Sequence, residues 1–435
     1  MSESVKPATG TSRELQVSVS FLNELLAGYK PRDFAIQFWD GSTWGAEAGQ
    51  PTRFTIVLRH PGSVRKMFWP PSNTTLAEAY VYNDFDIAGD IHGFFGMANY
   101  LKDLPWTPEQ RMKLAWRLVF GMPMQDRDKG GRQEAKLTGD VHSTDRDSQA
   151  IRYHYDVSND FYSLWLDPRM VYSCAYFEDP AVDLETAQKR KLDHICRKLR
   201  LKPGERLLDI GCGWGGLILH AAKNHGVSAL GITLSHNQQQ LASERIAQAG
   251  VSDRCKAIIC DYRKLDEPAG SFDKLVSVGM FEHVGEAMLP GYFKQAFELL
   301  KPGGTFLNHG IARNFQVPKE HEADFAKRYV FPDGELVPIS ATLRAAEEAG
   351  FEVRDVESLR EHYELTLRHW VKNLEDHADE ARKATDDTTY RIWRLYLAGS
   401  ANGFRTGIYS IHQALLVKPE RGQARLPLTR NDWYS

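Results

Sequence analysis

The segment RLLDIGCGWGG, residues 206–216, constrains the possible folds of this chain more than any other feature. Its first half is an apolar run typical of a buried strand, and glycines follow at positions 211, 213, 215 and 216. A strand that ends in such a loop and continues into a helix is typical of a βαβ unit, in which the loop backbone approaches a ligand closely. The glycines also match G-x-G-x-x-G, so the loop by itself leaves NAD open as the ligand.

Strands and helices alternate along the chain from residue 149 onward. The strands are predicted at 206–211, 227–235, 255–262, 274–281, 305–312, 351–359 and 407–419. The helices are predicted at 217–226, 236–250, 288–300 and 339–350. This alternation predicts a doubly wound α/β fold, with a parallel sheet covered by helices on both faces.

The first third of the chain has a different pattern. Residues 34–44 and 52–60 predict strands, and the apolar spacing over 75–101 predicts a helix. Residues 125–148 are polar and rich in charge and glycine, which predicts a linker. The predicted organisation is a disordered leader at 1–14, a small α+β domain at 15–124, a polar linker at 125–148 and a larger α/β domain at 149–435.

Composition argues against several classes of protein. The net charge of −3 gives no reason to expect a nucleic-acid partner. No apolar run approaches the ~20 residues of a membrane span, and the polar start lacks the apolar stretch of a signal peptide. The five cysteines include no C-x-x-C pair, which argues against a disulfide framework and a structural zinc site. We therefore predict a cytoplasmic protein with reduced thiols and no metal site.

The residues around the glycine loop weigh against NAD. A dinucleotide site usually carries an acidic residue ~20 positions beyond the loop, at the end of the second strand. That strand ends in GITLSHNQQ, where Thr233 and Gln238 can bind hydroxyl groups but no carboxylate is present. Asp209 would repel a pyrophosphate, yet it suits a cationic or amino-acid-bearing ligand. The turn KPGG at 301–304 has no evident use in a dehydrogenase of this fold.

Together these features resemble the class I S-adenosylmethionine-dependent methyltransferases over residues 203–312. More narrowly, most of residues 149–419 are similar to the cyclopropane-fatty-acyl-phospholipid synthase family. The segments that carry this resemblance are 151–177, 206–216, 231–239, 260–265, 277–285, 327–338 and 362–370. The resemblance implies a mostly parallel, seven-stranded methyltransferase sheet with a smaller α+β, lipid-binding-like domain at the N-terminus.

The resemblance also implies a reaction and its groups. A methylene from S-adenosylmethionine would be added across a cis double bond of an unsaturated phospholipid acyl chain, through a carbocation that a bound bicarbonate deprotonates. An alkene is a weak nucleophile, so the methyl group must be held in line and water excluded. The bicarbonate is placed on the backbone of Cys174 and Ile311 and on the side chains of Glu282, His309 and Tyr363. The cofactor is placed on Tyr172, Ser173, Asp209, Gly211, Gly213, Gly215, Thr233, Leu234, Gln238, Asp261, Tyr262 and Arg263.

Several alternatives stay open at this point. Outside the resemblance, Cys174 and His309 have ordinary explanations as core residues and Glu282 as a capping or surface carboxylate. The same alkene could be methylated to a methylene- or methyl-branched chain, or the protein could be a non-catalytic lipid-binding protein. Residues 107–124 interleave basic with large apolar residues, which fits either a lipid interface or a packed helix. We expect a peripheral association with the inner face of the membrane, and the resemblance leaves a homodimer open.

Overall fold

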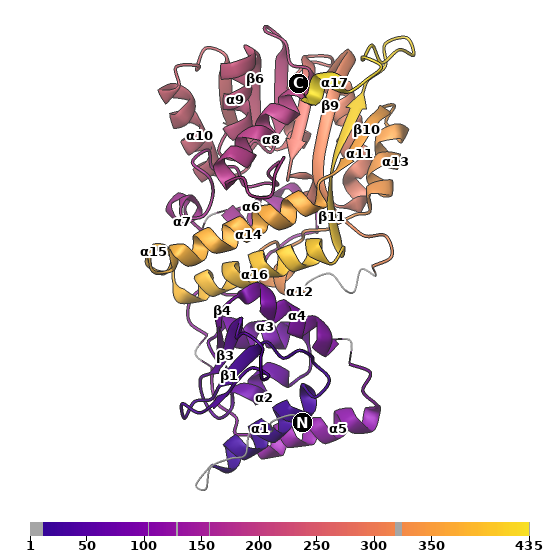
Figure 1. Cartoon of the computed structure of the whole chain (residues 1–435). Helices are drawn as coiled ribbons and strands as arrows, with labels where there is room; N and C mark the ends of the chain where they lie inside the picture. The colour runs from indigo at the N-terminus through magenta and orange to yellow at the C-terminus, as the bar shows by residue number, and fades with distance from the viewer. Residues whose placement is uncertain (1–11, 103, 128, 156, 318–323, 435) are drawn as a thin grey trace. The chain divides into compact units, whose positions relative to one another are not determined.

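The computed structural model describes residues 12–434, apart from 103, 128, 156 and 318–323 (Figure 1). The chain divides into two compact units, one of residues 1–133 and 386–402, the other of residues 134–385 and 403–435. Most of the predicted leader lies outside the described residues. Its last two residues already belong to helix α1 (Arg13–Leu25), whose first turn is capped by the Ser12 hydroxyl.

The first unit is built on a four-stranded sheet in the order β2-β1-β3-β4. Its strands are β1 (Phe34–Gln37), β2 (Thr43–Trp44), β3 (Phe54–Leu58) and β4 (Phe85–Gly89). Its helices are α1, α2 (Ser63–Phe68), α3 (Asn73–Val81), α4 (Ile91–Lys102), α5 (Pro108–Gly121) and most of α16 (Asp387–Arg405).

The prediction of one helix over residues 75–101 is wrong. The chain forms α3, then β4, then α4. Asn83 adopts a left-handed conformation, with φ of 59°, directly after α3. The alternating burial of β4 then matches its antiparallel pairing with β3, in which Ile87 faces Ile56. β4 has only five residues, so the apolar residues of the whole segment still follow a helical spacing although the strand interrupts it.

The second unit contains a seven-stranded sheet in the order β10-β11-β9-β8-β5-β6-β7. Only β11 runs against its neighbours, so the sheet is mostly parallel. The predicted α/β fold, with its seven-stranded sheet and smaller α+β unit, is confirmed. The strands are β5 (Arg206–Ile210), β6 (Ser228–Thr233), β7 (Cys255–Ile259), β8 (Phe272–Val278), β9 (Leu300–Arg313), β10 (Glu352–Ser358) and β11 (Tyr409–Val417).

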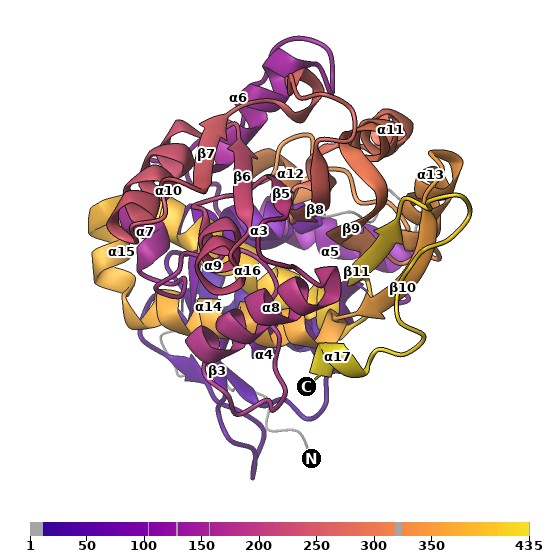
Figure 2. The same ribbon diagram turned by 90° about the horizontal axis from the view of Figure 1, so that it is seen from above.

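Helices cover both faces of this sheet (Figure 2). One face carries α8 (Leu184–Leu199), α9 (Gly216–His225) and α10 (His236–Gln248), and the other carries α11 (Leu289–Leu299) and α13 (Ile339–Glu348). Alternate residues of β5 supply both cores, since Leu207 packs toward the first face and Leu208 toward the second. The other helices of this unit are α6 (Thr144–Tyr155), α7 (Asn159–Ser163), α12 (Asp324–Tyr329), α14 (Arg360–Asp376), α15 (Ala378–Ala384) and α17 (Asn431–Tyr434), with the short 3-10 helices η1 (Tyr262–Lys264), η2 (Phe281–His283) and η3 (Glu286–Met288).

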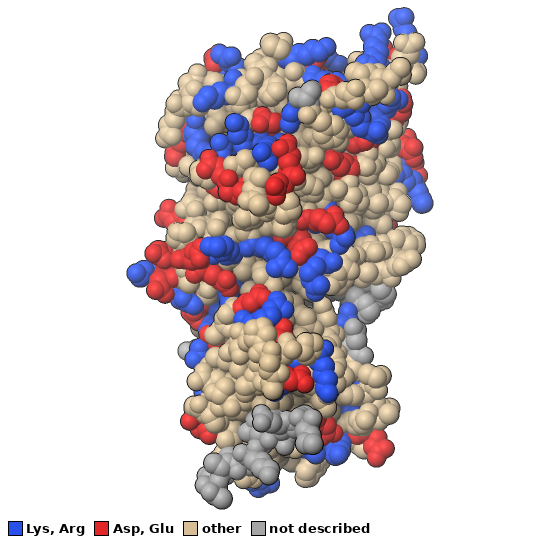
Figure 3. Space-filling model, in the orientation of Figure 1, with Lys and Arg blue, Asp and Glu red and all other residues tan. Residues whose placement is uncertain are grey.

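Two surface properties bear on possible partners. Within the described residues, no helix is both long and apolar enough to cross a membrane. On the face shown in Figure 3, basic and acidic side chains are interspersed, and neither sign gathers into one large patch.

Candidate active site

The glycine loop lies where β5 ends and α9 begins. Gly211 has a φ of +88°, and a Cβ there would stand 2.5 Å from the Cβ of Met280. Gly215 caps α9 in the left-handed conformation, with φ of +78°, and faces Ala242 of α10. Gly211 needs to be glycine because of its backbone angle and its close approach to Met280, which follows β8. Gly215 needs to be glycine because the chain turns there into α9.

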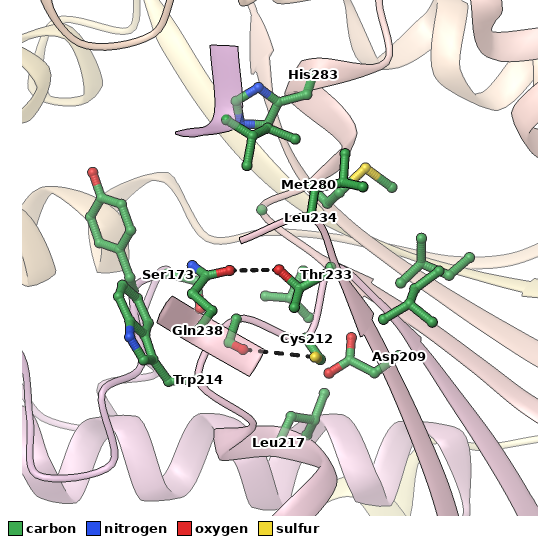
Figure 4. Close-up of a pocket in the computed structure, with 18 of the residues that line it drawn as sticks. Ser173, Asp209, Cys212, Trp214, Leu217, Thr233, Leu234, Gln238, Met280 and His283 are labelled. Atoms are coloured by element: carbon green, nitrogen blue, oxygen red, sulfur yellow. Dashed lines mark hydrogen bonds between the residues drawn. The ribbon is translucent and has the colours of Figure 1, made fainter. Parts of the chain in front are cut away.

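A pocket opens above this loop, at the carboxyl ends of β5, β6, β7 and β8. Ligands of doubly wound sheets bind at this edge. Figure 4 shows polar and apolar side chains from different elements pointing into one space. Of the predicted cofactor residues, Gly215 alone is not among those that line the pocket. The others line it: Tyr172, Ser173, Asp209, Gly211, Gly213, Thr233, Leu234, Gln238, Asp261, Tyr262 and Arg263.

The end of β6 presents a fixed pair of polar groups. The Thr233 hydroxyl donates to Oε1 of Gln238 over 2.7 Å, and both side chains are buried (Figure 4). Gln238 is held at the start of α10, where the Ser235 side chain caps the helix. With its carbonyl oxygen engaged by Thr233, the Gln238 amide group keeps donors for a ligand.

Two buried groups of opposite charge stand at the other side of the pocket. Asp209 is 2% exposed, and its Oδ1 has no hydrogen-bond partner among the described residues. Burial raises the pKa of this carboxyl to about 7, against the opposing effect of Lys191. Lys191 donates from Nζ to Oγ of Ser173 over 2.7 Å, and burial lowers its pKa to about 8. A ligand that carries both an ammonium and a carboxylate would satisfy both groups.

Arg263 closes a third side of the pocket. Its guanidinium bonds Asp261 of the same turn and reaches Oδ2 of Asp147 on α6, at 2.9 Å. It also donates to the carbonyl oxygen of His142. These contacts tie α6, which begins inside the predicted linker, to the pocket wall. They also engage the Asp261 carboxylate, which was predicted to contact the cofactor.

Aromatic rings line part of the pocket. The ring centroid of Tyr155 lies 6.1 Å from that of Trp214 and 6.3 Å from that of Tyr172. Trp214 is fixed by a 2.7 Å hydrogen bond from Nε1 to Oδ1 of Asn159. Electron-rich ring faces stabilise a nearby cation.

The predicted catalytic residues lie outside the lining of this pocket. They fall into two groups, one of Glu282, His309 and Ile311 and one of Cys174 and Tyr363. In the first, Oε1 of Glu282 accepts a 2.6 Å hydrogen bond from the backbone N–H of Ile311. His309 stands two residues earlier on β9, hence on the same face of the strand, and its carbonyl oxygen accepts from the N–H of Gly279 at the pocket. In the second group, the Cys174 thiol and the N–H of Tyr363 both point to the carbonyl oxygen of Leu359.

The first group keeps polar atoms unsatisfied. Gln413 donates from Nε2 to Nδ1 of His309 over 3.0 Å, which assigns the proton of the buried imidazole to Nε2. Neither His309 Nε2 nor Glu282 Oε2 has a partner among the described residues. Burial raises the pKa of Glu282 to about 7 and holds the pKa of His309 well below its usual range. The interior therefore keeps one donor and one acceptor without partners among the described residues.

One predicted contact is already in use. The N–H of Ile311, expected to bind the bicarbonate, donates to Glu282 instead. Sequence reasoning also missed Lys191 and Trp214, which line the pocket. Trp214 lies inside the glycine loop and could have been found there, whereas Lys191 comes from the upstream helix α8 and no local pattern marks it.

Comparison with known proteins gives matches over most of the chain. Residues 142–414 match the family model described as mycolic acid cyclopropane synthetase, and residues 21–103 match a domain of unknown function. A probable fatty acid methyltransferase of Pseudomonas putida is 41% identical over 403 residues, which is 92% of this chain and 95% of that protein.

Two further matches each cover 62% of the chain. Cyclopropane mycolic acid synthase 3 of Mycobacterium tuberculosis is 37% identical over 279 residues, 62% of this chain and 96% of that protein. The crystal structure of mycolic acid cyclopropane synthase CmaA1, complexed with SAH and CTAB, matches with a TM-score of 0.58 and 34% identity, covering 62% of this chain and 97% of that one.

Proposed function

This chain belongs to the mycolic acid cyclopropane synthetase family, and from that membership we propose that it converts a cis double bond of an unsaturated phospholipid acyl chain into a cyclopropane. It is an S-adenosylmethionine-dependent methyltransferase that acts on lipids. The observation that carries the finer proposal is the buried Glu282–His309 group, which keeps an open donor and an open acceptor. The backbone carbonyl oxygen of His309 also accepts from the N–H of Gly279, which lines the cofactor pocket.

S-Adenosylmethionine supplies an electrophilic methyl group to the reaction. The ammonium of its methionine part would pair with Asp209, whose Oδ1 has no partner among the described residues, and the carboxylate would pair with Lys191. The Thr233–Gln238 pair and the turn at Asp261 would hold the nucleoside part. The rings of Tyr155, Tyr172 and Trp214 would exclude water and stabilise the positive charge that develops on the acyl chain.

Bicarbonate, when bound, would supply the base that removes a proton before the ring closes. His309 Nε2–H would donate to it and Glu282 Oε2 would accept from its hydroxyl. Cys174 and Tyr363 complete the proposed set. The backbone of Ile311 would contribute to this site by holding Glu282 in place.

The name of the Pseudomonas putida relative supports a second candidate. It is called a probable fatty acid methyltransferase, and it matches this chain along nearly its whole length. The same pocket would methylate the same alkene, and a different position of the base would then give a methylene- or methyl-branched chain. A non-catalytic lipid-binding protein is a weaker candidate, because the pocket and its glycine loop are complete.

The lipid partner is proposed from an exposed stripe on α5. Met112, Trp116 and Phe120 recur at every fourth residue and are 69%, 64% and 67% exposed, while Leu114 and Leu118 face the core. We call Met112, Trp116 and Phe120 the α5 stripe. Arg111 and Lys113, both exposed, lie beside it. Large apolar rings flanked by basic side chains suit the surface of an anionic bilayer. We propose that this stripe brings the enzyme to the lipid.

Mass spectrometry of the lipid product separates the candidates. The full-length protein is incubated with S-adenosylmethionine, bicarbonate and vesicles of a cis-monounsaturated phospholipid. A gain of one CH2 in a chain that no longer takes up hydrogen at a double bond supports cyclopropanation. The same gain with a reducible double bond supports the methylene product. No gain and no cofactor binding would contradict the enzyme.

A further inference from the structure

A cysteine and two histidines meet where α8 and α9 pack together, away from the lining of the cofactor pocket. Cys196 belongs to α8, and His220 and His225 belong to α9. One ligand-type atom from each of the three side chains lies within 4.8 Å of the others. The proposed reaction uses none of these residues.

We propose that Cys196, His220 and His225 form a site for a zinc ion or a similar divalent transition metal of borderline softness. Zinc prefers thiolate sulfur and imidazole nitrogen in tetrahedral geometry, with bonds of ~2.3 and ~2.0 Å, so neighbouring ligand atoms stand ~3.5 Å apart. The ligand atoms, now within 4.8 Å of one another, need to approach by at most about 1.3 Å, which small side-chain rotations provide. The fourth position would be left to water or to another ligand.

The contacts of His220 match those of a metal-ligating histidine. Asp193 approaches Nε2 with Oδ1 at 2.7 Å, and the side-chain amide of Asn224 lies 3.0 Å from Nδ1. The amide donates, so Nδ1 holds the lone pair and Nε2 holds the proton that Asp193 accepts. A metal would take the lone pair in place of the Asn224 amide. The carboxylate of Asp193 would then orient the ring from behind, as carboxylates do at many zinc sites.

The protonation states also suit a metal. Burial lowers the pKa of both His220 and His225, so the imidazoles are neutral and can bind. Burial raises the pKa of the Cys196 thiol, so its proton would leave to solvent as the sulfur–metal bond forms. The charged neighbours are Asp193, which favours a cation, and Arg169 and Arg197, which oppose it. His225 is partly exposed and gives an entry route.

The position of the site suggests what the metal would do. α9 starts directly at the glycine loop, and α8 carries Lys191 into the cofactor pocket. A metal that joins α8 to α9 would stabilise the two helices that frame one wall of that pocket. The sequence analysis argued against a structural zinc site because the chain has no C-x-x-C pair. The three residues proposed here come from two helices and follow no such motif.

Metal titration of the full-length protein tests the proposal. The protein is freed of metal with a chelator and titrated with zinc in competition with a chromophoric chelator, and separately with cobalt(II). We expect one zinc per chain and a thiolate-to-cobalt charge-transfer band. His225→Gln is expected to weaken zinc binding by more than about tenfold, Asp193→Asn by about tenfold, and Cys196→Ala to remove the band.

Two control variants separate loss of a ligand from loss of structure. His236→Gln changes an exposed histidine of α10, and Cys255→Ala changes a buried cysteine of β7. Both are expected to keep the stoichiometry and the cobalt band. Because Cys196→Ala changes the core, the partly exposed His225 provides the independent variant. Stoichiometry well below one, or binding that His225→Gln and Cys196→Ala leave unchanged, would overturn the site.

Discussion

At the scale of single residues, Asp209 and Lys191 are buried ionisable groups that a zwitterionic ligand would pair in their charged forms. The folded apoprotein favours the protonated form of Asp209, because burial raises its pKa from 3.8 to about 7. The folded state therefore holds a proton that the unfolded chain releases. The contribution of Asp209 to the free energy of unfolding falls as the pH rises from about 4 to about 7.

The same two residues predict how cofactor binding depends on pH. Affinity for S-adenosylmethionine is expected to rise through about pH 7, as Asp209 ionises, and to fall above about pH 8, as Lys191 loses its charge. Asp209→Asn should remove the lower limb, and the exposed Asp266→Asn should change nothing. Calorimetric titration across this range measures both limbs. An unchanged profile in Asp209→Asn would rule out this carboxyl as the titrating group.

The Glu282–His309 group predicts a loss of turnover without a loss of cofactor binding. Glu282→Gln and His309→Gln are expected to lower product formation by about 10²–10⁴-fold, the range typical of lost acid–base assistance. Cofactor affinity should stay within about twofold, because neither residue lines the pocket. Product is followed by mass spectrometry, with the exposed Glu286→Gln as control. Equal losses of binding and turnover would indicate a structural role instead.

At the scale of elements, the loop between β5 and α9 combines two constraints that can be separated by mutation. In Gly211→Ala the new Cβ would be strained by a positive φ and would also collide with Met280. In Gly270→Ala the φ of +69° is the only constraint, because no atom lies within 4 Å of the new Cβ. Gly270→Ala should cost about 1 kcal/mol from backbone strain alone. Gly211→Ala should cost more in chemical denaturation and abolish cofactor binding. Similar costs for both variants would mean that the close approach to Met280 is relaxed easily.

The α5 stripe gives the second prediction at this scale. Trp116→Ser and Phe120→Ser should each weaken binding to anionic phospholipid vesicles by about tenfold, because each removes a large apolar side chain from the lipid contact. Added salt should weaken binding further, through Arg111 and Lys113. Vesicle sedimentation measures this, and Phe315→Ser, at an exposed apolar residue outside α5, is the matched control. If the control has the same effect, the contact is not specific to α5.

At the scale of the whole molecule, the chain returns to its first unit after building most of the second. Residues 386–402 group with residues 1–133, whereas the sequence predicted one continuous domain from 149 to the end. Arg391 of α16 bonds both carboxylate oxygens of Asp86 on β4 and the carbonyl oxygen of Tyr80 on α3. The fold of the first unit therefore depends on residues from near the end of the chain.

This return predicts a stability effect far along the sequence. Arg391→Ala should lower the free energy of unfolding by about 3 kcal/mol, because it leaves Asp86 with less of its compensating charge in a partly buried place. Lys372→Ala, which removes an exposed ion pair on α14, should cost less than about 0.5 kcal/mol. Urea denaturation followed by tryptophan fluorescence compares the two. Equal and small effects would show that Arg59 alone compensates Asp86.

The sequence by itself determined the features that depend on residues close together in the chain. The glycine loop and the alternation of strands and helices predicted the α/β sheet. The family resemblance, which short segments carry, proposed the cofactor residues, and nearly all of them line one pocket. The fold prediction is confirmed, and the proposed residues lie near one another, because a strand's carboxyl end and the loop after it are adjacent in the chain.

Only the tertiary structure decided the contacts between segments far apart in the chain. Lys191 reaches Ser173 and the pocket from α8, Glu282 takes the N–H of Ile311, and Arg391 completes a unit that begins at the other end of the chain. Each contact depends on how elements pack and on which buried polar groups must find partners. Burial of those groups, rather than any sequence spacing, also set the pKa values of Asp209, Lys191 and Glu282 on which the proposed chemistry depends.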